Sequence, residues 1–463
     1  MAQINLASQF YTRSDRGLPP EKLVNMVQEQ RPDGRTALIS TAGCTPFTVV
    51  GSAIRGMMQM DGVLSGDLIV VGATAVYRVT QAGVVSTIGA ISAPSKARIA
   101  TSLTETVAVI DGNAYQILSG GVNQLLDPDL GQVVDVVYGA GLFVYVEKDS
   151  DRIKWSEVLN AGVIGSASFA TAEKRPDRLR GCAMVGEDLV LFGYETLEIW
   201  GATGDITAPF QPRSGATSSI GCASRDSIVT FNDDVVGNRV GWLANDRTIR
   251  INTGGGAQNV TPFSMAEELG TLSDDEIKAV YGYTWSEEGR NLVAWNLPNS
   301  TWVFNVSTGL WNKRASLDGP LAVACAAEAW GKQIVGRTDS NALGVFDVRE
   351  RYDMGNPIVR NWTGSVPIDS DAFPIDTLTL RMALGDDPDV DTERFIWMRY
   401  SDTRGRIWSD WQRRSLGQQG QYRSSVEWGP CGAAEAPGRI FEFEIRDAYR
   451  PTISAIFINE VKA

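Results

Sequence analysis

Paired short apolar runs, separated by turn residues, recur along most of this chain. Between residues 187 and 205, the runs 189–192 and 197–200 flank a hinge at Gly193. Each run is too short for a helix and is rich in branched or aromatic residues, which is typical of buried β-strands. The pattern predicts an antiparallel hairpin. Because a two-stranded hairpin is not stable alone in water, it must pack against others.

Hairpins of this kind repeat at intervals of about 40 to 50 residues, the period of β-propeller blades. The predicted turns lie near Gly72, Gly112, Asp149, Gly193, Asn245, Pro298 and Thr338. A blade is a four-stranded unit repeated around an axis, and closing the ring protects the sheet edges. The sequence therefore predicts an all-β fold with a six- or seven-bladed β-propeller, since one hairpin can belong to a closing or irregular sheet. Stacked sandwiches with chance spacing are the alternative.

The long interval between Asn245 and Pro298 contains two helix-start signals. Ser264 is followed by Glu267, and Ser273 by Glu276, so each pair has the spacing of a capping box. We expect two short helices, near 265–269 and 274–281, that decorate one blade.

The two ends of the chain fall outside the repeat. Residues 1–50 are polar and proline-containing, which favours an extended N-terminal arm. The propeller is expected over 51–350. From 351 to 463 the alternating pattern of apolar and polar residues predicts a C-terminal β-sandwich-like region.

Composition narrows the possible chemistry. The chain has 463 residues, a formal net charge of −13, five widely spaced cysteines and no histidine. The lack of histidine excludes histidine-dependent triads and general bases. The odd, dispersed cysteines favour reduced and mostly buried thiols. Basic residues do not cluster as tight DNA binding requires, and no signal peptide or membrane-inserting segment is indicated.

Two motifs resemble known sites but favour structural roles. Residues 401–408 resemble the Asp-box hairpin of sialidase-type propellers, with Thr403 where that pattern has aspartate. Asp387, Asp389 and Asp391 have the alternate spacing of a calcium loop, yet Met398 stands where the bidentate glutamate belongs. A structural turn and a solvated acidic turn are the interpretations we favour.

Tryptophans are the remaining candidates. Trp295, Trp302 and Trp311 lie within one predicted blade, and their size suits packing between blades, with carbohydrate stacking as the alternative. From the residues alone we therefore expect no catalytic residue, no cofactor and no metal.

A resemblance to a known family emerges between Leu292 and Arg314. A strand ending at Pro298 leads to Thr301-Trp302, an aromatic strand, the turn Thr308-Gly309 and Trp311. This order resembles a signature of the tail hub proteins of short-tailed (podoviral) phages, the packaged-DNA stabilisation family.

Upstream residues match the same family's entry into its propeller. They are Leu23-Val24-Asn25, Gly43, Arg55-Gly56-Met57 and Asp61-Gly62. Ala42 stands where the family usually has proline.

The resemblance implies a structural role rather than an enzyme. It implies a homohexameric ring, or nozzle, below the portal and the head-to-tail adaptor that continues the DNA channel and helps to retain packaged DNA. Its implied partners are the adaptor, other tail proteins (fibre, spike or needle) and double-stranded DNA that passes without tight binding. The implied location is the virion tail, assembled in the host cytoplasm.

Two other functions remain open at this point. One is a propeller scaffold that binds host proteins, and the other is a polysaccharide-active propeller enzyme, which the tryptophans and the Asp-box-like hairpin would suit.

The N-terminal arm is the candidate partner interface. Its stiff prolines, aromatic residue and arginines are of the kinds enriched at interfaces. We expect docking onto a neighbouring subunit or the connector, with a disordered tail as the alternative. The candidate residues are Tyr11, Arg13, Arg16, Leu18, Pro19 and Pro20.

Overall fold

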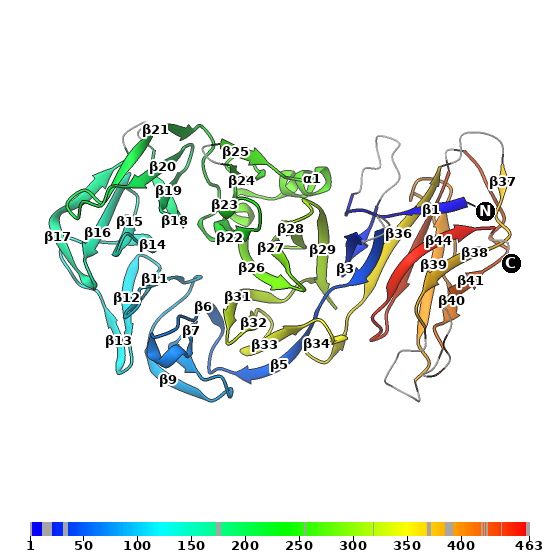
Figure 1. The fold of residues 1–463 in the computed structure, drawn as a ribbon, viewed down its shortest axis with the longest axis horizontal. Helices are drawn as coiled ribbons and strands as arrows, with labels where there is room; N and C mark the ends of the chain where they lie inside the picture. The colour runs from blue at the N-terminus through cyan, green and yellow to red at the C-terminus, as the bar shows by residue number, and fades with distance from the viewer. Residues whose placement is uncertain are drawn as a thin grey trace.

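The computed structural model is a ring of small sheets joined to a two-layer sandwich (Figure 1). It describes residues 2–11, 21–30, 36–172, 177–253, 256–317, 319–367, 372–384, 392–417, 420, 422, 425–436 and 438–459.

The first five blades of the ring are separate four-stranded antiparallel sheets. Blade 1 holds β6 (Ile54–Met58), β7 (Leu68–Gly72), β8 (Ala75–Val79) and β9 (Val85–Ala90); blade 2 holds β10 (Arg98–Thr101), β11 (Thr106–Ile110), β12 (Asn113–Leu118) and β13 (Gly121–Gln124). Blade 3 holds β14 (Val133–Gly139), β15 (Leu142–Glu147), β16 (Arg152–Glu157) and β17 (Asn160–Thr171); blade 4 holds β18 (Leu179–Val185), β19 (Asp188–Gly193), β20 (Leu197–Ala202) and β21 (Phe210–Ser218). Blade 5 holds β22 (Val229–Asp233), β23 (Gly237–Leu243), β24 (Ile249–Thr253) and β25 (Gly256–Asn259).

The last two blades connect the ring to the N-terminal part of the chain. Blade 6 holds β26 (Tyr281–Glu287), β27 (Arg290–Asn296), β28 (Thr301–Asn305) and β29 (Trp311–Ser316), which also pairs with β30 (Gly319–Pro320). Blade 7 holds β31 (Val323–Ala329), β32 (Lys332–Arg337) and β33 (Ala342–Asp347), and its outer strand is the N-terminal β5 (Gly43–Val49). Short strands β34 (Tyr352–Asp353) and β35 (Asn356–Pro357) extend this sheet. The described residues thus form seven blades, and β5 closes the ring.

Each predicted hairpin turn lies between the second and third strands of one blade. The predicted all-β propeller is therefore confirmed, and its blade number is the higher of the two expected. Spacing is uneven around blades 4 to 6 because a loop separates β20 from β21 and two helices separate β25 from β26.

Only one of the two expected capping boxes forms. Helix α2 (Asp274–Ala279) begins at Ser273, whose hydroxyl accepts a hydrogen bond from the Glu276 amide while the Glu276 carboxylate accepts one from the Ser273 amide. Helix α1 (Phe263–Thr271) begins two residues earlier than the Ser264 signal requires, with Pro262 at its N-cap, so the Ser264–Glu267 capping box is wrong although a helix does form here.

The C-terminal region is a sandwich of two antiparallel sheets around its own core. One layer contains β41 (Ser425–Trp428), β38 (Leu378–Met382), β44 (Thr452–Ile458), β4 (Thr36–Ser40) and β3 (Met26–Gln30). The other contains β40 (Gln412–Ser415), β39 (Phe395–Ser401), β43 (Gly438–Ile445), β36 (Arg360–Pro367) and β2 (Leu23–Val24). A small sheet pairs β37 (Phe373–Pro374) with β42 (Ala433–Ala434).

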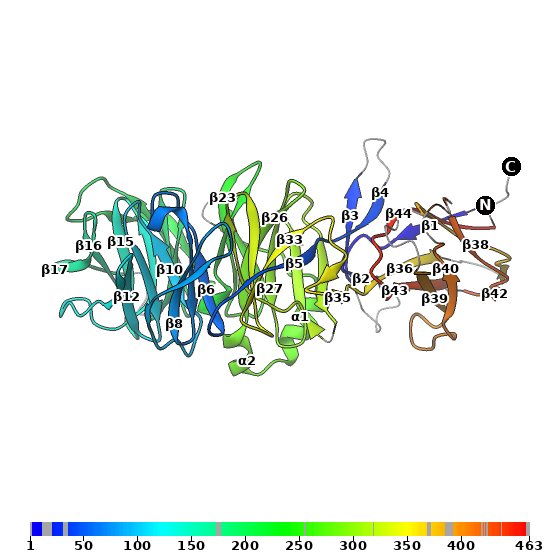
Figure 2. The ribbon, with the colours of Figure 1, turned by 90° about the horizontal axis from the view of Figure 1, so that it is seen from below.

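The N-terminal residues differ from the expected extended arm. Strand β1 (Ala2–Leu6) pairs with both β36 and β44 and so joins the two layers, and β2 pairs in parallel with β29 of blade 6. These strands complete sheets whose other members lie almost three hundred positions or more further along the chain. The propeller is therefore an insertion between N-terminal and C-terminal parts of the sandwich, as Figures 1 and 2 show.

Candidate functional site: the propeller axis

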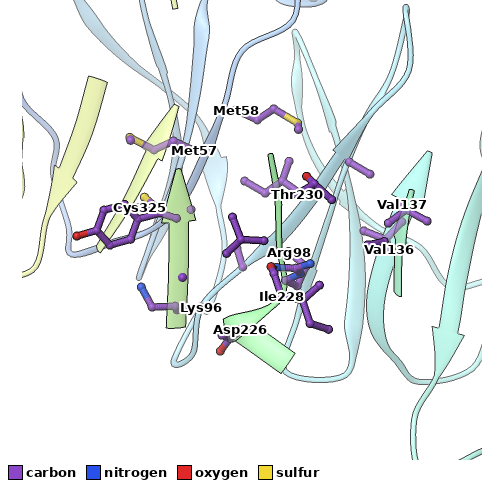
Figure 3. Close-up of a pocket in the computed structure, with 18 of the residues that line it drawn as sticks. Met57, Met58, Lys96, Arg98, Val136, Val137, Asp226, Ile228, Thr230 and Cys325 are labelled. Carbon is purple, nitrogen blue, oxygen red and sulfur yellow. The ribbon is translucent and has the colours of Figure 1, made fainter. Parts of the chain in front are cut away.

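The first strands of the blades surround an axial cavity of about 480 Å³ (Figure 3). Strand residues that line it come from blades 1 to 7, and at its centre they are small or apolar. They include Met58, Val137, Met184, Thr230, Thr284 and Ala326. Inner strands point alternate side chains toward the axis, so the axis is largely filled with side chains.

The two ends of the axis differ in chemistry. At one end an adjoining cavity of about 490 Å³ is lined by side-chain amides, among them Asn232, Asn238 and Asn291. At the other end lie Arg55, Lys96, Arg98 and Asp226, three of which are labelled in Figure 3.

Asp135 anchors the charged end. Its buried carboxylate accepts hydrogen bonds from Arg98 Nε at 2.9 Å, from its neighbour Val136 and from the Cys182 amide of blade 4. Arg98 also donates through Nη1 to the Ile228 carbonyl next to blade 5. The Arg98–Asp135 ion pair and the hydrogen bonds that its two side chains make therefore link blades 2, 3, 4 and 5.

Two further cations cross the axis at this end. Arg225 donates to the Val134 carbonyl of blade 3 at 2.8 Å and to the Lys96 carbonyl between blades 1 and 2 at 3.1 Å. Lys96 Nζ donates to the Ala324 carbonyl of blade 7 and lies 3.5 Å from the centre of the Tyr281 ring of blade 6. Because these bonds join blades on opposite sides, they close the axis and fix the ring.

Electrostatics at this end favour structure over catalysis. Burial lowers the pKa of Lys96. Burial also acts to lower the pKa of Arg98. Attraction to Asp135 and Asp226 outweighs burial, so the pKa of Arg98 is raised. Burial also raises the pKa of Cys182, and that of Cys325 to about 11. Both thiols are therefore protonated at neutral pH and are poor nucleophiles.

Within the described residues, no group of three or more acidic or cysteine side chains is arranged to hold a metal ion. None of the helices in this part of the chain is long and apolar enough to cross a membrane. All five cysteines are free thiols, and only Cys325 is not fully buried.

The structure describes one of the predicted interface residues. The backbone of Tyr11 forms an isolated antiparallel β-bridge with that of Glu21. The Tyr11 ring packs against the ring of Phe263 in α1, with the ring centres 6.4 Å apart. The other predicted interface residues lie outside the described residues: Arg13, Arg16, Leu18, Pro19 and Pro20. Most of the suspected calcium loop, including Asp387, Asp389 and Asp391, also lies outside them.

The Asp-box-like segment forms the turn between β39 and β40. The Thr403 hydroxyl accepts a hydrogen bond from the Ile407 amide at 2.7 Å, and Trp408 Nε1 donates to the Gly405 carbonyl at 2.9 Å. Thr403 thus holds the turn internally, as a structural role requires.

The three blade-6 tryptophans are buried in one hydrophobic cluster. Trp295 Nε1 donates to the Ser227 carbonyl beside blade 5, and Trp302 Nε1 donates to Glu268 of α1. They therefore pack blade 6 against its surroundings and present no face for stacking a sugar.

Sequence reasoning did not select the axial cations. One signal was present, because Asp135 interrupts the longest apolar region of the chain. A carboxylate inside a buried strand needs a cationic or hydrogen-bonding partner, but the sequence does not show which cation reaches it.

The fold and the axis together define a seven-bladed propeller with a closed centre, built as a structural ring. The chain belongs to the phage stabilisation family, whose description is bacteriophage P22 Gp10, β-propeller, and the match covers residues 2–348.

No match was found among curated proteins. Three solved structures are similar to this chain at low identity. BamB from Moraxella catarrhalis is 10% identical, with a TM-score of 0.36. The match covers 64% of this chain and 98% of the BamB chain. The extracellular domain of BT4673 from B. thetaiotaomicron is 8% identical, with a TM-score of 0.45. The match covers 90% of this chain and 62% of that domain's chain. An exo-β-1,3-galactanase from Phanerochaete chrysosporium is 10% identical, with a TM-score of 0.27. The match covers 73% of this chain and 96% of the galactanase chain.

Proposed function

We propose that this protein is the tail hub, or nozzle, of a short-tailed phage. Six copies form a ring below the portal and the head-to-tail adaptor, continue the DNA channel and help to retain packaged DNA. Family membership carries the proposal, because the matched residues include β1 to β4 as well as the whole propeller.

The closed axis supports a ring of several copies. The side chains of the seven inner strands leave a cavity of about 480 Å³ at the axis. The major groove of B-DNA alone is about 12 Å wide and 8.5 Å deep. A duplex cannot pass through one propeller, so a DNA channel must lie between copies.

The ring contacts the adaptor and other tail proteins such as a fibre, spike or needle, and it belongs to the virion tail after assembly in the host cytoplasm. The net charge of −13 disfavours tight contacts with phosphates, since such binding depends on clustered cations. DNA therefore passes through the channel without tight binding to the protein.

Light scattering on the purified protein, alone and mixed with a portal–adaptor connector, tests the proposal. We expect a species of about six times the 50.2 kDa chain, either spontaneously or on the connector. A mass that stays at one chain under both conditions would contradict the hub. Turnover of a glycan that is lost on substituting one acidic residue would instead support the enzyme alternative.

A further inference from the structure

Arginine and tryptophan side chains alternate on the outer face of one sandwich layer. The guanidinium carbon of Arg399 lies 4.6 Å from the ring centre of Trp408 and 4.5 Å from that of Trp411. The guanidinium carbon of Arg446 lies 5.5 Å from the ring centre of Trp411 and 4.8 Å from that of Trp397. Because a cation is attracted to the face of an aromatic ring, these five side chains form one continuous stack, the Arg–Trp ladder.

Carboxylates of β43 hold the ladder in one arrangement. Glu442 accepts a hydrogen bond from Arg399 Nε at 2.7 Å, and Glu444 pairs with Arg446. Tryptophan and arginine are enriched at the hot spots of protein interfaces. Since the arginines are already fixed, a partner binds this surface with little loss of side-chain freedom.

The exposed part of this layer is basic and partly apolar. Ile407, in the turn between β39 and β40, is 71% exposed. Between residues 395 and 415 and between 438 and 446, the exposed charged side chains are Arg406, Asp410, Arg413 and Arg446. Three exposed cations thus lie beside one exposed carboxylate, so an acidic surface with apolar side chains is the complement of this layer.

A surface with these properties lies on the propeller. In each blade the turn from the first strand to the second lies at the amide-lined end of the axis, as does the turn from the third strand to the fourth in blades 1 to 6. We call the surface formed by these turns the tip face. Eight large apolar side chains are exposed in or next to the turns: Val84, Leu103, Leu118, Val158, Leu159, Ile206, Val235 and Val236. Single exposed apolar residues are ordinary, but eight at one end of the ring indicate a contact surface.

The tip face is also acidic. Its exposed carboxylates are Asp61, Glu157, Glu187, Asp205, Asp234, Glu288 and Glu328. Among the described residues in or next to the same turns, the exposed cations are Arg213, Lys332 and Arg349. Arg213 already pairs with Asp188. The tip face is therefore complementary to the basic layer that carries the ladder.

We propose that the Arg–Trp ladder of one copy docks on the tip face of the next copy, an inference that rests on the ring of the proposed function. The contact joins two different surfaces, and contacts of this kind close into rings when the rotation between copies allows it. Figure 2 shows β39 and β40 on the side of the molecule that carries α1 and α2, opposite the tip face. One copy therefore presents its two surfaces to two different neighbours.

Nucleic acid suits the ladder less well than a second copy does. Both arginines of the ladder already pair with carboxylates, Arg399 with Glu442 and Arg446 with Glu444. Phosphate binding relies on cations that are available to displace counterions. The stacked rings and the apolar turn instead match the exposed apolar side chains of the tip face.

Charge reversal tests the contact with purified chains, by light scattering. Arg413→Glu with Arg446→Glu makes the ladder layer acidic, and Glu157→Lys with Glu187→Lys and Glu328→Lys makes the tip face basic. We expect each variant alone to lose at least tenfold in the affinity of ring assembly, since like charges then face each other. An equimolar mixture of the two variants should assemble, because the ladder layer of each meets the tip face of the other and a ring of six allows strict alternation.

Matched variants provide the controls. Arg178→Glu, at an arginine that is 69% exposed and outside both surfaces, should assemble as the parent does. Ile407→Ser removes an apolar contact without changing charge and should also weaken assembly, whereas Leu126→Ser, at a side chain that is 77% exposed at the opposite end of the ring, should not. Thermal unfolding checks that each variant is folded.

The outcomes separate this contact from the tail role. If the parent forms a ring and the reversed variants assemble unchanged, or if their mixture does not recover assembly, the docking is wrong and the proposed function stands. A parent that stays at one chain, alone and on the connector, would overturn both. If the reversed ladder assembles normally but loses affinity for a labelled single-stranded oligonucleotide, the ladder binds nucleic acid and the docking is wrong.

Discussion

At the residue scale, buried charge organises the propeller axis of this protein. Asp135 was visible in the sequence as an acid within an apolar region, yet its partners Arg98 and the Cys182 amide come from other blades. Arg98, Cys182 and Arg225 reach this end of the axis only because the ring closes. Local pattern can reveal such a buried charge, whereas tertiary structure alone reveals what neutralises it.

Removing Asp135 should destabilise the propeller. In Asp135→Ala, Arg98, which is 23% exposed, loses a fully buried carboxylate, and breaking a buried pair from one side costs up to about 3–5 kcal/mol. Equilibrium unfolding in denaturant measures the change. Asp149→Asn is the control, because Asp149 and Arg178 are 72% and 69% exposed and 3.9 Å apart, asparagine tolerates the positive φ of this position, and exposed pairs contribute about 0–1 kcal/mol. Equal effects of the two substitutions would argue against a structural role for the axial pair.

Glu442 should contribute to the loss of stability in acid. Its buried carboxylate pairs with Lys22 at 2.7 Å and with Arg399 at 2.6 Å. Burial acts to raise the pKa of Glu442, but these cations and Asn361 outweigh it and lower the pKa below the ordinary value of 4.5. The unfolded chain therefore takes up a proton first as pH falls, so this stability is present above about pH 4.5 and is lost below it.

The free energy of unfolding, measured between pH 7 and pH 3, checks this assignment. Glu442→Gln should be less stable than the parent at pH 7 and should lose less stability on acidification. Glu187→Gln, at an exposed glutamate, should keep the parent profile. A Glu442→Gln profile parallel to that of the parent would show that this carboxylate does not titrate differently in the two states.

At the element scale, the repeat was predictable and the pairing of the ends was not. All seven hairpins and helix α2 follow from local signals, namely apolar runs, turn residues and the Ser273–Glu276 box, whereas α1 begins at Pro262 and not at the Ser264 signal. Strands β1 to β4 are short, lie in polar sequence and are stabilised by partners such as β36 and β44, far away in the chain. No local pattern encodes that pairing.

The predicted N-terminal interface can be tested without damaging these strands. Replacing residues 12–20 by a short glycine linker keeps β1 and the Tyr11–Glu21 bridge. We expect a folded protein with weaker ring or particle assembly, because the removed residues are the ones predicted to dock on a neighbour. Light scattering and thermal unfolding measure the two properties.

A longer deletion provides the contrast. Removing residues 2–20 takes away β1 and the buried Ile4, Ala7 and Phe10, so the sandwich should lose stability as well. If the 12–20 replacement assembles as tightly as the parent, these residues are only a tail.

At the scale of the whole molecule, the propeller and the sandwich form one continuous unit. Parallel pairing of β2 with β29 and antiparallel pairing of β2 with β36 carry hydrogen bonds from blade 6 into the sandwich. Strand β5 then closes blade 7 from the N-terminal side. The two parts therefore cannot separate without breaking sheet pairing.

An image reconstruction of assembled tails, with DNA inside, tests directly whether this protein forms the hub ring. We expect six copies around one lumen, with duplex density between the copies and with every propeller axis closed. Duplex density along the axis of a single propeller, or particles whose tails contain no ring of this protein, would contradict it.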